Sequence, residues 1–147
     1  ALSSAASDVY KRQVYNDLRR ILKMKNVVKT DKAPGAIGPY SQGINVGDMY
    51  FFSGQIPLVP ETGEMPEGIE AQAHQSLKNV QGLLESQGLT FANVIKTTVF
   101  LDNMDDFVTV NDIYAQYFVE PFPARSAVEV AKLPKGALIE VEVIATK

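Results

Sequence analysis

Apolar and polar residues along this chain of 147 residues follow two periods, one typical of strands and one typical of helices. Alternation at every second position predicts strands over residues 25–30, 43–46, 49–54 and 92–101, and two more within residues 122–145. Helical spacing predicts a long helix over residues 67–87, with the apolar stripe Ile69, Ala73, Leu77, Val80 and Leu84. A second helix is predicted over residues 104–118, which buries Phe107, Val110, Ile113, Tyr114 and Phe118.

Turn-forming residues separate these elements. Gly47 and Asp48 suit a tight hairpin between two of the strands. Pro121 and Pro123 end the second helix, because proline cannot continue one. The resulting order is strands, helix, strand, helix and two strands, which predicts an α+β fold with two helices packed on one face of a mixed sheet. We expect a single domain over residues 24–147.

The face of this sheet that carries no helix is predicted to be too apolar to stay in water. Alternation turns four residues of one strand toward the helices, namely Ile95, Thr97, Val99 and Leu101. It turns four other apolar residues onto the uncovered face, namely Val94, Phe100, Leu138 and Ile144. Because contiguous apolar patches mark interfaces, we expect a homo-oligomer with these faces turned inward.

Residues 122–145 contain the strongest candidate for a functional site. They read as two strands joined by a Pro-Lys-Gly turn. Alternation gives their apolar side Val128, Val130, Ile139, Val141 and Val143. Arg125 and Glu140 would then share a face away from the main core. Glu129 and Glu142 lie on the same side, so spacing alone does not choose among the three glutamates.

The first 23 residues differ in composition from the rest of the chain. Residues 8–13 read as the translated end of a sequencing-library transposon. We therefore interpret residues 1–23 as a leader that comes from adaptor read-through or another non-native extension. A transit peptide is the alternative, because the segment contains serine and arginine and few acids. Helical spacing of Val14, Leu18, Ile21 and Leu22 predicts a short helix here.

Composition and charge exclude several kinds of site. The chain has no cysteine and one histidine, His74, so it offers no disulfide, no thiolate and no His-rich metal site. Residues 1–23 hold five basic and two acidic side chains; taking these from the totals of 14 and 17 leaves a net charge of −6. A domain this acidic is a poor partner for nucleic acid. No apolar run is long enough to cross a membrane, and we expect a cytoplasmic protein.

Three motifs carry a resemblance to a known family. They are A-P-G-A-I-G-P-Y-S-Q at residues 33–42, F-S-G-Q-I-P at residues 52–57, and P-A-R-S-A-V-E-V-A-K-L-P-K-G-A at residues 123–137. Together with Asn111 they closely resemble the RidA (YjgF) family of enamine/imine deaminases, over residues 24–147. The resemblance implies a chorismate-mutase-like fold and a homotrimer with ligand sites between subunits. It also implies hydrolysis of 2-aminoacrylate, 2-iminobutanoate and related imino acids to 2-keto acids and ammonia, with no cofactor.

The resemblance also implies roles for single residues. Arg125, the only arginine outside residues 1–23, matches the family's substrate-binding position, and its planar fork can hold a carboxylate through two hydrogen bonds. The family match selects Glu140 among the three glutamates to orient the attacking water. Tyr40 is expected to present its hydroxyl to the substrate, which completes the expected catalytic set. Substrate binding is expected from Arg125, Ser53, Gly54 and Asn111.

One departure from the family pattern concerns redox chemistry. Many relatives carry a cysteine two residues after the arginine, where this chain has Ala127, so thiol-based switching is not expected. Two other functions stay open at this point. An endoribonuclease or translation inhibitor is one, although the sequence has no basic stripe and its lone histidine is poorly placed for RNA cleavage. The other is a non-catalytic trimer that binds a keto acid.

Overall fold

The computed structural model describes residues 3–147 and contains one six-stranded mixed sheet. Its strands are β1 (Asn26–Val28), β2 (Gly43–Val46), β3 (Met49–Gln55), β4 (Val94–Leu101), β5 (Ala124–Glu129) and β6 (Ile139–Thr146). They lie in the order β1-β2-β3-β6-β4-β5, and only β4 and β5 run parallel. The helices are α1 (Ser4–Met24), α2 (Ile69–Ser86) and α3 (Phe107–Tyr114). The expected α+β class and mixed sheet are confirmed.

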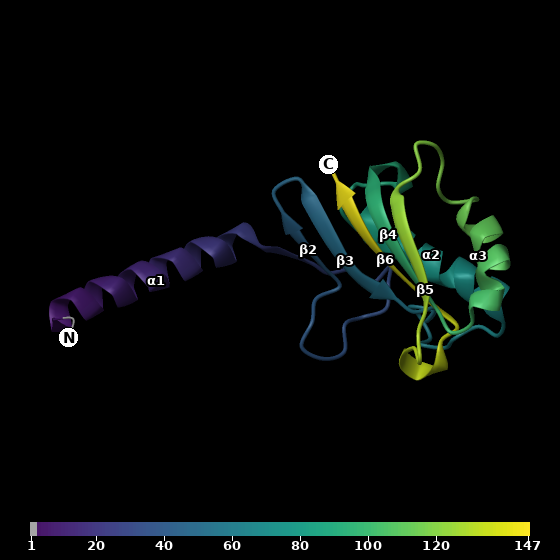
Figure 1. Cartoon of the computed structure of the whole chain (residues 1–147), viewed down its shortest axis with the longest axis horizontal. Coiled ribbons are helices and arrows are strands. Elements are labelled where there is room, and N and C mark those ends of the chain that lie inside the picture. The colour runs from purple at the N-terminus through teal and green to yellow at the C-terminus, as the bar shows by residue number, and fades with distance from the viewer. Residues whose placement is uncertain (1–2) are drawn as a thin grey trace.

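Helices α2 and α3 pack together on one face of the sheet (Figure 1). The expected apolar stripe of α2 forms the centre of the core, because Ala73, Leu77, Val80 and Leu84 are at most 1% exposed. The helix α3 is shorter than expected, since residues 104–106 form a separate 3₁₀ turn before it. Within residues 3–147, no helix covers the opposite face of the sheet (Figure 1).

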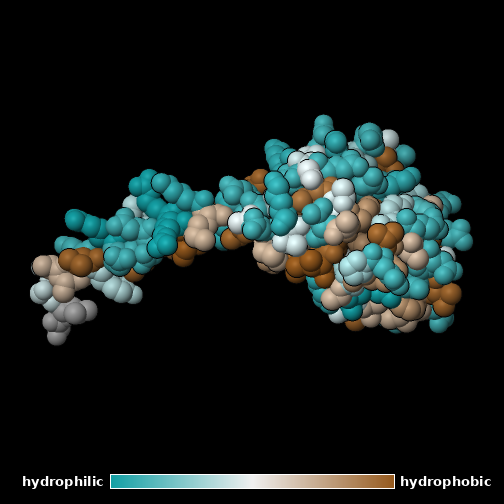
Figure 2. All heavy atoms as spheres, turned by 90° about the horizontal axis from the view of Figure 1, so that it is seen from above, coloured by the Kyte–Doolittle hydropathy of each residue, from teal (hydrophilic) through white to brown (hydrophobic). Residues whose placement is uncertain are grey.

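Helix α1 extends away from the sheet as a separate arm (Figures 1 and 2). Its N-cap is Ser3, whose hydroxyl accepts a hydrogen bond from the backbone N–H of Ala6 at 3.3 Å. None of its residues is buried, so no tertiary packing holds it. The predicted helix is confirmed and is longer than expected. That residues 1–23 are a leader stays a prediction. None of the described helices, α1 included, has the length and apolarity to cross a membrane.

A β-bulge in β4 reverses two of the expected positions. The register with β6 shifts between Val94 and Lys96, so the strand does not alternate there. Val94 is consequently buried at 5% exposure, whereas Ile95 is turned outward at 43%. Beyond the bulge, Thr97, Val99 and Leu101 face the helices as expected.

The strand β5 presents the opposite face from the one expected. It is an edge strand paired with β4, not with β6, and its register sets Arg125 beside the buried Thr97 and Ala127 beside Val99. Arg125 therefore lies on the helix-covered face, while Glu140 on β6 lies on the uncovered face opposite Phe100. The expectation that Arg125 and Glu140 share a face is wrong. Burial does not constrain the alternation of an edge strand whose residues are nearly all exposed.

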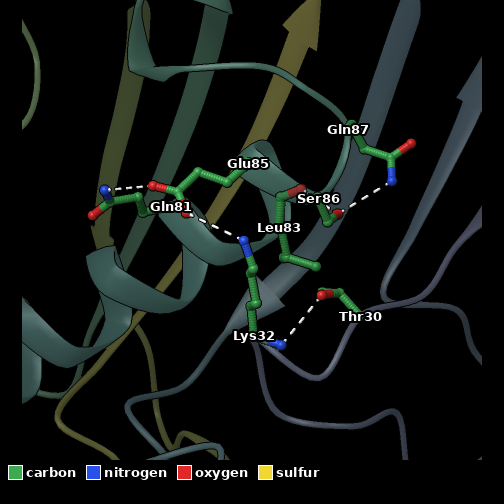
Figure 3. A network of polar contacts seen from close by, with 7 residues as sticks. All are labelled: Thr30, Lys32, Gln81, Leu83, Glu85, Ser86 and Gln87. Carbon is green, nitrogen blue, oxygen red and sulfur yellow. Dashed lines mark hydrogen bonds and ion pairs between the residues drawn. The ribbon is translucent and has the colours of Figure 1, made fainter.

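The first part of the loop between β1 and β2 packs closely against α2. A Cβ at Gly82 would overlap the carbonyl oxygen of Lys32, so glycine is needed for this close approach. The Lys32 ammonium lies 3.7 Å from Glu85 Oε2, and its backbone N–H donates to Thr30 Oγ1 at 3.2 Å (Figure 3). The loop carrying residues 33–42 is thus held against the helix layer.

Candidate active site in two halves

A cavity of about 590 Å³ opens beside the ends of β3 and β6. Four expected site residues line it, namely Tyr40, Ser53, Gly54 and Glu140. Lys135 adds a positive charge, and the apolar part of the wall comes from Pro34, Ile37, Ile56, Leu58 and Pro134. The cavity therefore combines one carboxylate, one ammonium and an apolar wall, which suits a small anionic molecule with an apolar part.

Gln42 fixes the loop that brings Tyr40 to this cavity. Its side chain is 4% exposed, and its Oε1 accepts from the backbone N–H of Thr30 at 2.7 Å. Its Nε2 donates to the carbonyl oxygens of Thr30, Ala33 and Pro34 at 2.9, 3.2 and 2.9 Å. The amide of Gln42 thus provides hydrogen-bond partners for backbone groups that have no strand or helix to pair with. Tyr40 itself remains 53% exposed, with its ring available to a ligand.

A bulge places Ser53 and Gly54 at the cavity. The β3–β6 register shifts between Phe52 and Gln55, which frees the intervening backbone from regular pairing. The Ser53 hydroxyl donates to the carbonyl oxygen of Ser41 at 2.6 Å, which ties the strand to the Tyr40 loop and leaves its oxygen able to accept. At Gly54 a Cβ would overlap the carboxylate of Glu140, so only glycine allows that carboxylate to lie against the strand.

Glu140 differs from the other two candidate glutamates. It is half-buried, and desolvation, reinforced by the nearby Glu142, raises its pKa above the usual value. Glu142 is exposed and does not line the cavity. Glu129 is engaged elsewhere, because its Oε2 accepts from the backbone N–H of Met104 at 2.7 Å. Of the three, only Glu140 lines one of the two cavities that hold the expected site residues.

The second group of expected site residues surrounds Arg125. A separate cavity of about 380 Å³ is lined by Asn111, Tyr114, Ala115, Phe122, Pro123 and Arg125. Arg125 Nη1 donates to Asn111 Oδ1 at 2.9 Å. Its Cζ lies 4.8 Å from the ring centroid of Tyr114 and 5.4 Å from that of Phe107. No carboxylate among residues 3–147 forms an ion pair with this guanidinium.

The six expected site residues therefore form two sets. Tyr40, Ser53, Gly54 and Glu140 gather at one cavity, Asn111 and Arg125 gather at the other, and the two linings share no residue. Sequence reasoning missed Phe107 and Tyr114 as neighbours of Arg125, and Lys135 as a cavity residue. A signal existed for Lys135, since it sits in the Pro-Lys-Gly turn of the third motif. In the structure its backbone is left-handed, at φ 56°.

Comparisons with known proteins identify the family of this chain. The family described as "Endoribonuclease L-PSP" matches residues 30–147. The 2-iminobutanoate/2-iminopropanoate deaminase of Escherichia coli (strain K12) is 50% identical over 127 residues, covering 84% of this chain and 99% of that protein.

Two solved structures are similar throughout the sheet domain. Escherichia coli TdcF with bound serine has a TM-score of 0.80 at 47% identity and covers 84% of this chain and 99% of that one. RidA from the Antarctic bacterium Psychrobacter has a TM-score of 0.81 at 42% identity, with 83% and 99% covered. The chain belongs to the RidA/YjgF family of L-PSP proteins.

Proposed function

We propose that this protein is a reactive-intermediate deaminase that hydrolyses 2-imino acids, such as 2-iminobutanoate and the tautomer of 2-aminoacrylate, to 2-keto acids and ammonia. The observation that carries the proposal is Arg125, an oriented guanidinium that pairs with no carboxylate among residues 3–147. An arginine held ready in this way fits the carboxylate of a ligand. The relative named 2-iminobutanoate/2-iminopropanoate deaminase supports the same substrate class. The cytoplasm stays the predicted location.

The active site is completed between two copies of the chain. Arg125 and Glu140 lie on opposite faces of one sheet, so a molecule as small as an imino acid cannot contact both within a single chain. Apolar residues exposed on the uncovered face favour assembly, since Phe51 is 45% and Val128 42% exposed. Apolar patches also interrupt the hydrophilic surface of the domain in Figure 2. We propose the chorismate-mutase-like homotrimer of the family, with uncovered sheet faces turned inward.

The chemistry follows from the two charges. Arg125 of one subunit binds the substrate carboxylate, which places the C=N carbon beside Glu140 of the next. Glu140 orients a water molecule and takes its proton as the oxygen bonds to that carbon, and the nitrogen gains a proton. The Glu140 carboxyl then gives its proton to the amino nitrogen, the carbon–nitrogen bond breaks to release ammonia, and the new hydroxyl gives its proton to water to leave the keto acid. The raised pKa of Glu140 makes it a stronger base than an ordinary glutamate.

The remaining residues position the substrate. Ser53 offers its hydroxyl oxygen at the same wall as Glu140, and Gly54 brings the strand backbone next to the carboxylate. The Tyr40 hydroxyl serves as a donor toward the substrate or the attacking water, at the exposed rim of the cavity. Asn111 contributes by holding Arg125.

A coupled assay tests the proposal. A pyridoxal-phosphate dehydratase generates 2-iminobutanoate from threonine, and the release of 2-oxobutanoate is followed with and without the protein. We expect the protein to accelerate release and Arg125→Ala to abolish the acceleration. Glu129→Gln is the matched control, because Glu129 lines neither cavity and a glutamine can still accept from Met104. Release no faster than in free solution would refute the proposal.

An endoribonuclease is the second candidate, favoured by the description of the matching family. The Glu140 cavity holds one lysine and one carboxylate, which is a poor surface for a polyanion. RNA cleavage that copurifies with the protein and disappears in Glu140→Ala would reverse this assignment. Binding of 2-oxobutanoate without any turnover would instead indicate a non-catalytic keto-acid sensor.

A further inference from the structure

One stripe of α3 faces the guanidinium of Arg125. Phe107, Asn111 and Tyr114 are spaced i, i+4 and i+7, so they lie on the same side of the helix. All three contact Arg125, through the two rings at 5.4 and 4.8 Å and the hydrogen bond to Asn111 at 2.9 Å. The helix thus meets this single side chain of β5 with two aromatic faces and one acceptor.

We propose that Phe107 and Tyr114 are positioning residues for Arg125, forming an aromatic platform that holds its guanidinium in the binding orientation. Asn111 accepts from Nη1, while Nε and Nη2 have no hydrogen-bond partner among residues 3–147. These two nitrogens form one edge of the planar fork, which matches the two oxygens of a carboxylate. Because Asn111 occupies Nη1, the Nε–Nη2 edge is the one left to bind substrate. This inference rests on the proposed function, because it assigns the ligand of Arg125.

The platform is rigid because the core holds Tyr114. Its hydroxyl lies 2.9 Å from Thr97 Oγ1, and its ring stacks on Phe118 with centroids 4.2 Å apart. Thr97 is fully buried and Phe118 is 1% exposed. An arginine that rests on a fixed ring loses less freedom on binding a ligand than one that moves freely in solvent.

The contact between Tyr114 and Arg125 is that of a cation and a neutral ring. Burial raises the pKa of Tyr114, and this outweighs the opposing effects of Thr97 and Arg125. The phenol therefore stays protonated at neutral pH and does not neutralise the guanidinium. Arg125 keeps its full charge for the ligand, and the attraction to the ring is a cation–π interaction.

Substitutions at the platform test this inference through binding. We expect Phe107→Leu to weaken the binding of 2-oxobutanoate about threefold, measured by titration calorimetry, and to raise KM by the same factor with little change in kcat. Tyr114→Leu should weaken binding further, and Tyr114→Phe should restore most of the affinity because it keeps the ring. The matched control is Phe91→Leu, since Phe91 is also half-buried and packs against the core without contacting Arg125.

Two results would contradict the proposal that Phe107 and Tyr114 position Arg125. One is unchanged affinity in both Phe107→Leu and Tyr114→Leu, with thermal melts showing that both variants are folded. The other is an equal loss in Phe91→Leu, which would indicate general loosening of the core. Arg125→Ala separates the two proposals. If it binds 2-oxobutanoate normally, the proposed function loses its carboxylate site; if it fails to bind while the ring variants bind normally, only the platform is wrong.

Discussion

The two half-sites hold opposite charges by different means. Glu140 lies half-buried against the backbone of Gly54, in a wall built from a loop and a bulged strand. Arg125 lies exposed on an edge strand and is held by side chains of α3. Among residues 3–147 the carboxylate thus loses hydration without forming an ion pair, while the guanidinium keeps its hydration and pairs with no carboxylate. Each half is electrostatically incomplete, and we therefore expect that neither catalyses alone.

Removing either charge should have the largest effect. We expect Glu140→Ala to lower kcat/KM by about a hundredfold or more, because a positioned general base contributes about that much. Arg125→Ala should cause a comparable loss, because the substrate then has no anchor for its carboxylate. Steady-state kinetics in the dehydratase-coupled assay measure both. A large loss in only one variant would show that one half suffices for catalysis.

Mixing the two inactive variants tests whether the halves come from different chains. In randomly mixed closed rings of Arg125→Ala and Glu140→Ala subunits, about one interface in four pairs an intact Arg125 with an intact Glu140. We therefore expect activity to return to about a quarter of the wild-type value after the variants are unfolded and refolded together. Variants mixed without subunit exchange provide the control. No recovery after verified exchange would place both halves in one chain.

Removing the side chain that anchors the Tyr40 loop should lower the free energy of unfolding. Gln42→Ala leaves a buried N–H and three carbonyl groups without their partner, so we expect unfolding to become easier by about 2–3 kcal/mol. Urea denaturation measures this loss. Gln87→Ala is the control, because Gln87 bonds through its side chain only to Ser86 Oγ at 3.1 Å. Equal stability of the two variants would contradict the anchoring role of Gln42.

The desolvated carboxylate should reduce stability at neutral pH. Folding raises the pKa of Glu140, so its contribution to stability is full at low pH and is lost as pH rises through the folded-state pKa. Glu140→Gln should therefore melt at a higher temperature than the wild type at pH 7, and the difference should shrink toward pH 4. Melting curves at both values test this. A variant that is less stable at pH 7 would mean that an unseen partner stabilises the charge.

The smallest effect is expected at the ion pair between Lys32 and Glu85. Both side chains are about half exposed and lie 3.7 Å apart, so water screens their attraction. Lys32→Ala should change the free energy of unfolding by less than about 0.5 kcal/mol. The same urea titration compares it with Gln42→Ala. A larger loss would mean that the charged contact, and not the buried amide, fixes the loop.

Much of the fold could be predicted from the sequence because burial constrains most of its elements. The stripe of α2 and the alternation of β6 follow the pattern of a strand or helix packed on a core. At β5 this constraint is absent, because five of its six residues are exposed. The choice of face for Arg125 therefore depended on which strand lies beside β5, a long-range fact that alternation does not contain.

The composition of the site was easier to predict than its geometry. Arg125 is the only arginine in the domain, and the motifs around Tyr40 and Ser53 match a family, so the residue types were available from the sequence. Their division into two cavities was not, because it results from strand order. The contacts of Phe107 and Tyr114 with Arg125 were not predicted, because the apolar pattern of this helix is explained equally well by packing in the core.

The separation of Arg125 and Glu140 by one sheet has a consequence for gene duplication. If the site is completed between subunits as proposed, then once two copies of such a gene exist, one can lose its arginine and the other its glutamate, and mixed rings would still contain working sites. Neither copy can then be deleted, although no new activity has been gained. Mutual dependence between paralogous subunits thus requires only two ordinary substitutions, one on each side of the sheet.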